Sequence, residues 1–154
     1  MRALCILLLV GLVGCAGPRH LSVQISNSDK SSKVKILGEF SHKDYEDARK
    51  ALKIISSFMP EMVFTNSPKI SWMDSKDFAG ITLMNGTREI LIDKEFKIKK
   101  GSNLEYFDFG RILGHEYLHF ERNMAEPEVN EEIDKPLYLI FQNKYQQILN
   151  FNWK

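Results

Sequence analysis

The sequence predicts an α+β fold, in which a small antiparallel or mixed sheet with a hairpin packs against helices. Strand-like runs with alternating apolar residues end near residue 93, and from residue 102 onward the apolar residues recur at helical spacing. An Asn-Gly dipeptide between two of the apolar runs also predicts a hairpin. Strands and helices that are largely segregated along the chain are typical of the α+β class.

The first fifteen residues, MRALCILLLVGLVGC, have the features of an export signal. One basic residue precedes an apolar run of about 11 residues, which suits a signal peptide and is too short for a membrane span of about 20. The stretch from Leu12 to Cys15 resembles a bacterial lipobox. This resemblance implies a signal peptide over residues 1–14 and a palmitate-type lipid modification of Cys15. An uncleaved membrane anchor and an ordinary secretory signal cut elsewhere remain alternatives.

A lipidated chain would be a lipoprotein of the cell envelope, held to the membrane by its N-terminus. Ala16 follows the modified cysteine, and a residue other than Asp at this place favours the outer membrane in a bacterium with two membranes. Residues 15–30 then form the lipidated N-terminus with a tether and a first strand, and residues 31–154 form one domain. Because Cys5 leaves with the signal and Cys15 carries lipid, any metal site must use His, Asp or Glu.

The charge balance argues against nucleic-acid binding. The chain is 27% charged but has a formal net charge of only +1, without the basic surface that nucleic-acid binding requires.

The elements of the first half follow from local patterns. Strands are expected at residues 21–26 and 34–40, and another at 69–73. Ser41 with Asp44 makes a capping box that opens a helix, which runs until Pro60. Residues 79–84 and 88–93 flank the Asn85-Gly86-Thr87 turn and should form two antiparallel strands, one of them a candidate for the edge of the sheet.

The second half is expected to be helical. Ser102 with Glu105 forms another capping box and opens a helix that reaches about Asn123. Pro127 suits the first turn of a following helix. Pro136 cannot donate a backbone hydrogen bond, so that helix is either kinked there or restarts.

The stretch GHEYLH inside the helix that begins after Ser102 carries the pattern of a zinc hydrolase. At about 100° per residue, His115 and His119 lie about 40° apart on one helix face, so both imidazoles can reach one ion. Glu116 points about 100° away from His115, within reach of a water on that ion. A pair of structural histidines on a half-buried helix is the alternative.

A catalytic zinc site needs a third protein ligand and one position for water. Arg122 and Ala125 stand where a metzincin has its glycine and third histidine, which excludes that group. Acids follow instead, at Glu126, Glu128, Glu131, Glu132 and Asp134. Asn130-Glu131 followed by Asp134 resembles a shortened form of the Asn-Glu stretch in gluzincin, thermolysin-like metallopeptidases. The resemblance implies that Glu131 is the third ligand, with Glu132 in reserve, and that Asp134 supports a metal-binding histidine. A solvated helix start rich in acids is the alternative.

The residues themselves indicate a metal site with a base, and the resemblance to gluzincins implies a zinc peptidase of zincin-like fold with an active-site helix, a ligand helix and an N-terminal helix, here anchored to a membrane. The expected cofactor is Zn²⁺ and the expected partner is a peptide or protein substrate, which the hairpin strand would bind in extended form. Glu116 would be the general base. Arg122, Tyr138 and His42 are alternative oxyanion donors. A non-catalytic lipoprotein acting as a binding or envelope-interaction module, and a hydrolase of another amide or ester, are the competing hypotheses.

Overall fold

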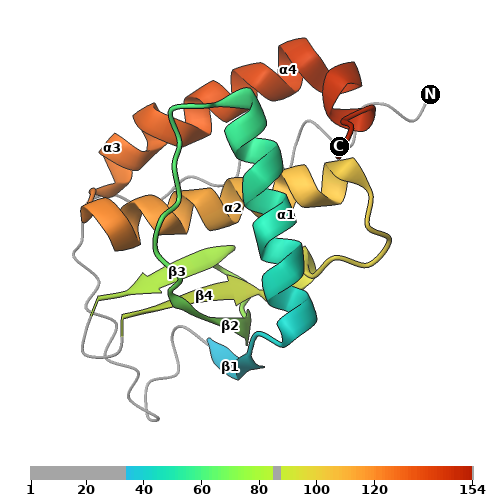
Figure 1. The fold of residues 1–154 in the computed structure, drawn as a ribbon. Helices are drawn as coiled ribbons and strands as arrows, with labels where there is room; N and C mark the ends of the chain where they lie inside the picture. The colour runs from blue at the N-terminus through green and yellow to red at the C-terminus, as the bar shows by residue number, and fades with distance from the viewer. Residues whose placement is uncertain (1–33, 85–87, 154) are drawn as a thin grey trace.

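The structure is a computed structural model that describes residues 34–84 and 88–153. Four expected features lie outside the described residues: the signal peptide, the lipidation site at Cys15, the strand at 21–26 and the Asn85-Gly86-Thr87 turn. Within the described part, no helix is both long and apolar enough to cross a membrane. The fold is α+β, as the sequence predicted (Figure 1).

A mixed four-stranded sheet forms one side of the molecule, in the order β1-β2-β4-β3. Its strands are β1 (Lys35–Glu39), β2 (Lys69–Asp74), β3 (Gly80–Leu83) and β4 (Glu89–Asp93). The β3–β4 pair is antiparallel, which confirms the expected strand pairing, and β3 lies at the edge of the sheet. The parallel pairing of β2 with β4 was not specified by the sequence.

The first two long helices begin at the predicted capping boxes. Helix α1 (His42–Phe58) has Ser41 as its N-cap, and Ser41 and Asp44 bond each other reciprocally. Helix α2 (Asn103–Arg122) begins in the same way at Ser102 with Glu105, and it ends at Asn123 in the left-handed conformation. A short 3-10 helix, η1 (Lys94–Phe96), between β4 and α2 was not expected.

The C-terminal helical region is continuous through Pro136. It starts with α3 (Glu126–Val129), passes through the π-helical turn η2 (Asn130–Asp134) and continues as α4 (Lys135–Leu149). Pro127 lies in the first turn of α3, as predicted. The N–H of Lys135 donates to the carbonyl of Asn130, the wider spacing of a π turn. Pro136 thus lies in the first turn of α4, directly after the π turn, and the helical region does not end there.

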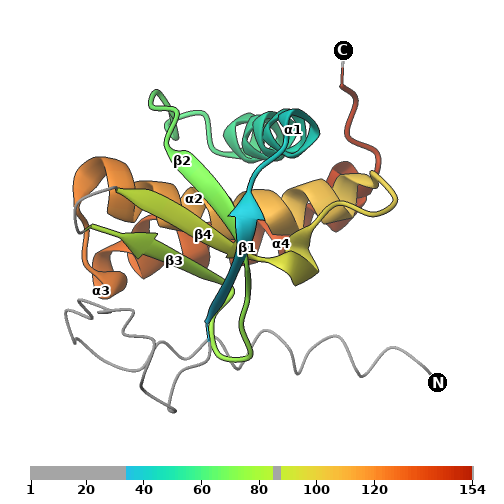
Figure 2. The same cartoon turned by 90° about the horizontal axis from the view of Figure 1, so that it is seen from below.

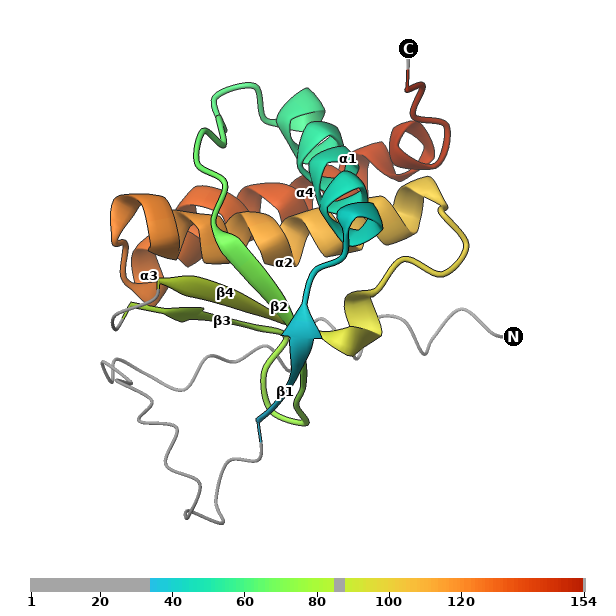
Figure 3. The same ribbon diagram turned by 60° about the horizontal axis from the view of Figure 1, so that its bottom comes forward.

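Helix α2 is the central element of the molecule (Figures 2 and 3). It packs against the sheet on one side and against α4 on the other, and α1 crosses it. The core between these layers is aromatic and aliphatic, and its large side chains with almost no exposure include Ile54, Ile55, Ile70, Ile90, Ile92, Phe107, Phe109, Leu113 and Ile133. The segment of α2 that carries His115, Glu116 and His119 therefore lies on a helix that packs against other elements on several sides.

Candidate metal centre

The two motif histidines converge as their helical spacing predicted. The Nε2 atoms of His115 and His119 are 3.1 Å apart, and the two ring centroids are 4.9 Å apart. His115 is only 8% exposed. Both imidazoles therefore aim the same nitrogen at one point beside α2.

The opposite nitrogen of each ring is held by a hydrogen-bond acceptor. Nδ1 of His115 lies 2.9 Å from Oδ2 of Asp134, and Nδ1 of His119 lies 2.7 Å from the carbonyl oxygen of Met124. A carbonyl can only accept, so Nδ1 of His119 carries the hydrogen, and a carboxylate favours the same tautomer in His115. In the neutral rings both Nε2 lone pairs then face each other, and a proton or a metal cation between them would stabilise this arrangement.

Glu126, the first residue of α3, supplies a carboxylate to the same point. Its Oε2 lies 3.4 Å from Nε2 of His115 and its Oε1 lies 3.4 Å from Nε2 of His119. One ligand atom from each of the three residues falls within 4.8 Å of the others. The cluster thus offers two imidazoles and one carboxylate.

These separations suit a tetrahedral zinc site. Two ligand atoms bonded to one tetrahedral zinc at about 2.0–2.1 Å are about 3.4 Å apart. The imidazole nitrogens are 3.1 Å apart, and each lies 3.4 Å from its nearer carboxylate oxygen, which is Oε2 for His115 and Oε1 for His119. The residues present therefore fit a zinc ion held by His115, His119 and the carboxylate of Glu126.

The structure brings Glu126, and not the expected Glu131, to the two histidines. Glu131 lies on the exposed side of η2, where its carboxylate pairs with Lys135, and the reserve residue Glu132 pairs with Arg122. Glu126 was recognised in the sequence only as a member of the acidic cluster. The left-handed Asn123 ends α2 one turn after His119 and lets the chain fold back, which brings Glu126 to the histidines. Asp134 takes the supporting place beside His115 that the sequence predicted.

Glu116 is buried next to the cluster and is held by the edge strand. The residue is 6% exposed, and its Oε2 accepts a hydrogen bond from Oγ1 of Thr82 in β3 at 2.7 Å. Burial raises the pKa of this carboxyl, and the charges of His115 and His119 oppose the rise. The carboxylate is thus close enough to both imidazoles to interact with them electrostatically.

The surrounding carboxylates make the cluster attractive to positive charge. Burial alone would lower the pKa of His115, but hydrogen bonds with Asp134 and Glu126 outweigh it and raise that pKa to about 10. Burial would also lower the pKa of His119, but the hydrogen bond with Glu126, the charge of Glu116 and the bond with the Met124 carbonyl together raise it. A divalent cation would satisfy the same acids by taking the place of these protons.

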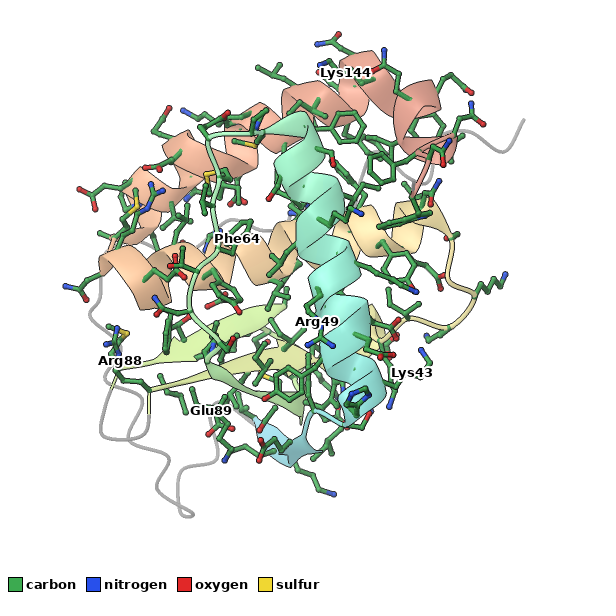
Figure 4. The ribbon with its side chains drawn as sticks, in the orientation of Figure 1. Lys43, Arg49, Phe64, Arg88, Glu89 and Lys144 are labelled. Atoms are coloured by element: carbon green, nitrogen blue, oxygen red, sulfur yellow. The ribbon has the colours of Figure 1, made fainter. Side chains whose placement is uncertain are left out.

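The edge hairpin is attached to the end of α2 by Arg88 (Figure 4). Its guanidinium lies 4.7 Å from the centre of the Phe120 ring and donates to the carbonyl of the same residue. On the other side of α2, Phe64 packs edge-on against Tyr117 with ring centres 5.4 Å apart. These contacts fix the motif segment between the hairpin and the α1–β2 connection.

The three candidate oxyanion donors have other partners. Arg122 pairs with Glu132, and exposed Tyr138 accepts a hydrogen bond from Gln142. His42 lies at the exposed start of α1 beside Glu46.

Comparisons with known proteins returned no match: no family model fits this chain, and no curated protein or solved structure is significantly similar to it.

Proposed function

We propose that this chain is a membrane-anchored, zinc-dependent peptidase. One observation carries the proposal: two imidazole nitrogens and a carboxylate converge at ligand spacing beside a second, buried carboxylate on the same helix. A structural histidine pair would not need an acid at Glu126 and another at Glu116. The combination of a three-residue ligand set and an adjacent base is that of a catalytic zinc site.

Each residue of the site has a separate role. His115, His119 and Glu126 would hold the ion, while Asp134 and the carbonyl of Met124 orient the two imidazoles. A zinc ion held there would polarise the scissile carbonyl and activate the attacking water. Glu116 would take a proton from that water and return it to the leaving amine. Its burial beside the cluster suits it for this transfer.

The edge strand favours a peptide as the substrate. The N–H of Asp93 donates to the carbonyl of Ala79, so alternate residues of β3 bond to β4. Gly80 and Thr82 therefore direct their main-chain N–H and C=O groups away from β4. An extended peptide can pair with these groups and lie along β3 next to Glu116, as in β-strand addition.

The lipid anchor rests on the N-terminal sequence. Metabolic labelling of cells with a radioactive or clickable fatty acid should label the wild-type chain, and Cys15→Ala should abolish the label. A labelled Cys15→Ala chain would contradict the anchor while leaving the zinc site untouched.

The catalytic proposal is tested on the full chain, purified in detergent. We expect one zinc per chain in both the wild type and Glu116→Gln, with hydrolysis of a mixed peptide library by the wild type only. Glu95→Gln serves as the matched control, because Glu95 is an exposed glutamate in η1 and should keep full activity. A wild type without zinc would overturn the metal site. Zinc in both chains without hydrolysis would favour the non-catalytic binding module, and cleavage confined to esters or other amides would favour the third hypothesis.

A further inference from the structure

We propose that Thr82 is a positioning residue for Glu116 and that Gly80 keeps open the space that the positioned carboxylate occupies. This inference rests on the proposed function, in which Glu116 is the general base. It assigns two residues of the edge strand β3 a part in the reaction besides pairing with the substrate.

The Thr82 hydroxyl contacts Glu116 at two points. Its Oγ1 lies 2.7 Å from the carboxylate oxygen Oε2 and 2.9 Å from the main-chain carbonyl oxygen of the same residue. A hydroxyl has one hydrogen to donate, and the shorter contact is to the charged acceptor, which makes the stronger bond. Thr82 therefore restrains Oε2 and presents Oε1 as the oxygen that exchanges the proton.

Gly80 lies against the other side of the Glu116 carboxylate and leaves room for it because it has no side chain. A Cβ atom at this position would lie 2.5 Å from Oε1, 2.7 Å from Cγ and 2.9 Å from Cδ of Glu116. All three distances are shorter than real Cβ contacts, so any side chain would displace the carboxylate. The atoms in conflict belong to one side chain and none to the backbone, so the fold can absorb the change by moving Glu116.

The two contacts connect substrate binding with the base. Gly80 and Thr82 direct their main-chain groups away from β4, and the same two residues confine the Glu116 carboxylate through Thr82 Oγ1 and the Gly80 backbone. The strand that would pair with the peptide is therefore the same strand that positions the carboxylate, so the peptide is held at a fixed place relative to Oε1. Catalysis depends on such positioning, because small displacements of a reacting group cost large factors in rate.

The first test compares Thr82→Val and Thr82→Ser with the wild type. Valine keeps the shape and loses the hydroxyl, and we expect kcat to fall about tenfold to a hundredfold while KM and the zinc Kd stay within about twofold. Serine keeps the hydroxyl and should restore kcat to within about threefold of the wild type. If Thr82 only ties β3 to α2, Thr82→Val should instead lower the Tm without a fall in kcat at unchanged KM.

Ser71→Ala is the matched control. Ser71 in β2 donates its hydroxyl to the buried carboxylate of Glu89, so this variant loses the same kind of bond in the same sheet, away from the metal cluster. We expect it to lower the Tm by an amount similar to Thr82→Val and to leave kcat unchanged. An equal loss of kcat in both variants would show a general effect of stability and would overturn the inference.

The second test is Gly80→Ala. We expect a folded chain with wild-type zinc content and a kcat at least tenfold lower, because the new Cβ displaces the carboxylate. A wild-type kcat in Gly80→Ala or Thr82→Val, with an active wild type, would overturn the positioning role and spare the proposed function. A wild type that binds zinc without hydrolysing peptides would overturn both.

Discussion

His115 and Asp134 lie on different helical segments, yet Nδ1 of the imidazole is 2.9 Å from Oδ2 of the carboxylate. The carboxylate belongs to the last residue of η2, where the π turn meets α4. It fixes the tautomer of His115 and turns Nε2 towards His119 and Glu126. The π turn thus helps to set the geometry of the cluster formed by His115, His119 and Glu126.

Asp134→Asn should weaken zinc binding about tenfold to a hundredfold, because the amide keeps the size of the side chain but removes the charge that makes His115 a better ligand. Competition with a chromophoric zinc chelator measures the change in Kd. Asp77→Asn, which alters an exposed acid in the β2–β3 loop, should bind zinc like the wild type. Equal affinity in Asp134→Asn and the wild type would mean that Asp134 does not support the ligand.

Glu126→Gln should weaken zinc binding more than about a hundredfold, since it removes the charge of the only carboxylate that the described cluster contains. Glu131→Gln and Glu132→Gln should leave the zinc Kd unchanged, because these acids pair with Lys135 and Arg122 instead. Isothermal titration with zinc distinguishes the three variants. A large loss confined to Glu131→Gln would restore the ligand set first expected from the sequence.

The sequence predicted the elements whose signals are local. Both capping boxes formed where Ser41 and Ser102 have an acid three residues later, because that bond pattern involves only one helical turn. The convergence of His115 and His119 followed for the same reason, from spacing within one helix. These features needed no knowledge of the rest of the chain.

The place of Glu126 beside the histidines and the order of the strands depend on contacts that local sequence patterns do not reveal. Glu126 reaches the histidines because Asn123 adopts the left-handed conformation and the chain reverses within a few residues. If a regular helix ran through the acidic residues, nothing in the sequence would favour Glu126 over Glu131 as the acid nearest the histidines. The parallel β2–β4 pairing likewise joins segments separated by the hairpin, and alternation of apolar residues does not reveal which strands become neighbours.

Zinc should stabilise the fold against heat, and a chelator should reverse the effect. The ligands come from α2 and α3, so the complete site exists only in the folded chain. Free zinc at about a thousand times its Kd would add about 4 kcal/mol to the free energy of unfolding. For a domain of this size that corresponds to a rise in Tm of about 10 °C or more.

Differential scanning calorimetry with zinc and then with an excess of chelator measures this shift. His119→Ala should unfold at the same temperature under both conditions, because it lacks a ligand. A wild type whose Tm does not respond to zinc would contradict the metal centre.

Gly110→Ala should destabilise the chain although alanine is the better helix former. Helix α1 crosses α2 at this glycine, and an added Cβ would lie 2.4 Å from the carbonyl oxygen of Ala51 and 2.7 Å from Cγ1 of Ile55. Overpacking of this kind costs about 1–3 kcal/mol, against a gain in helix propensity of about 1 kcal/mol. The atom in conflict is a backbone oxygen, so the helices must move apart, and the net free energy of unfolding should fall.

Chemical denaturation of the chelator-treated chain measures this loss without a contribution from zinc. Asp108→Ala is the matched control, since it also introduces alanine in α2 but at an exposed position, and it should be neutral or stabilising. The folded fraction of Gly110→Ala should still bind zinc with the wild-type Kd, because the crossing with α1 contains none of the ligands. An unchanged or increased free energy of unfolding in Gly110→Ala would contradict the close approach of α1 and α2.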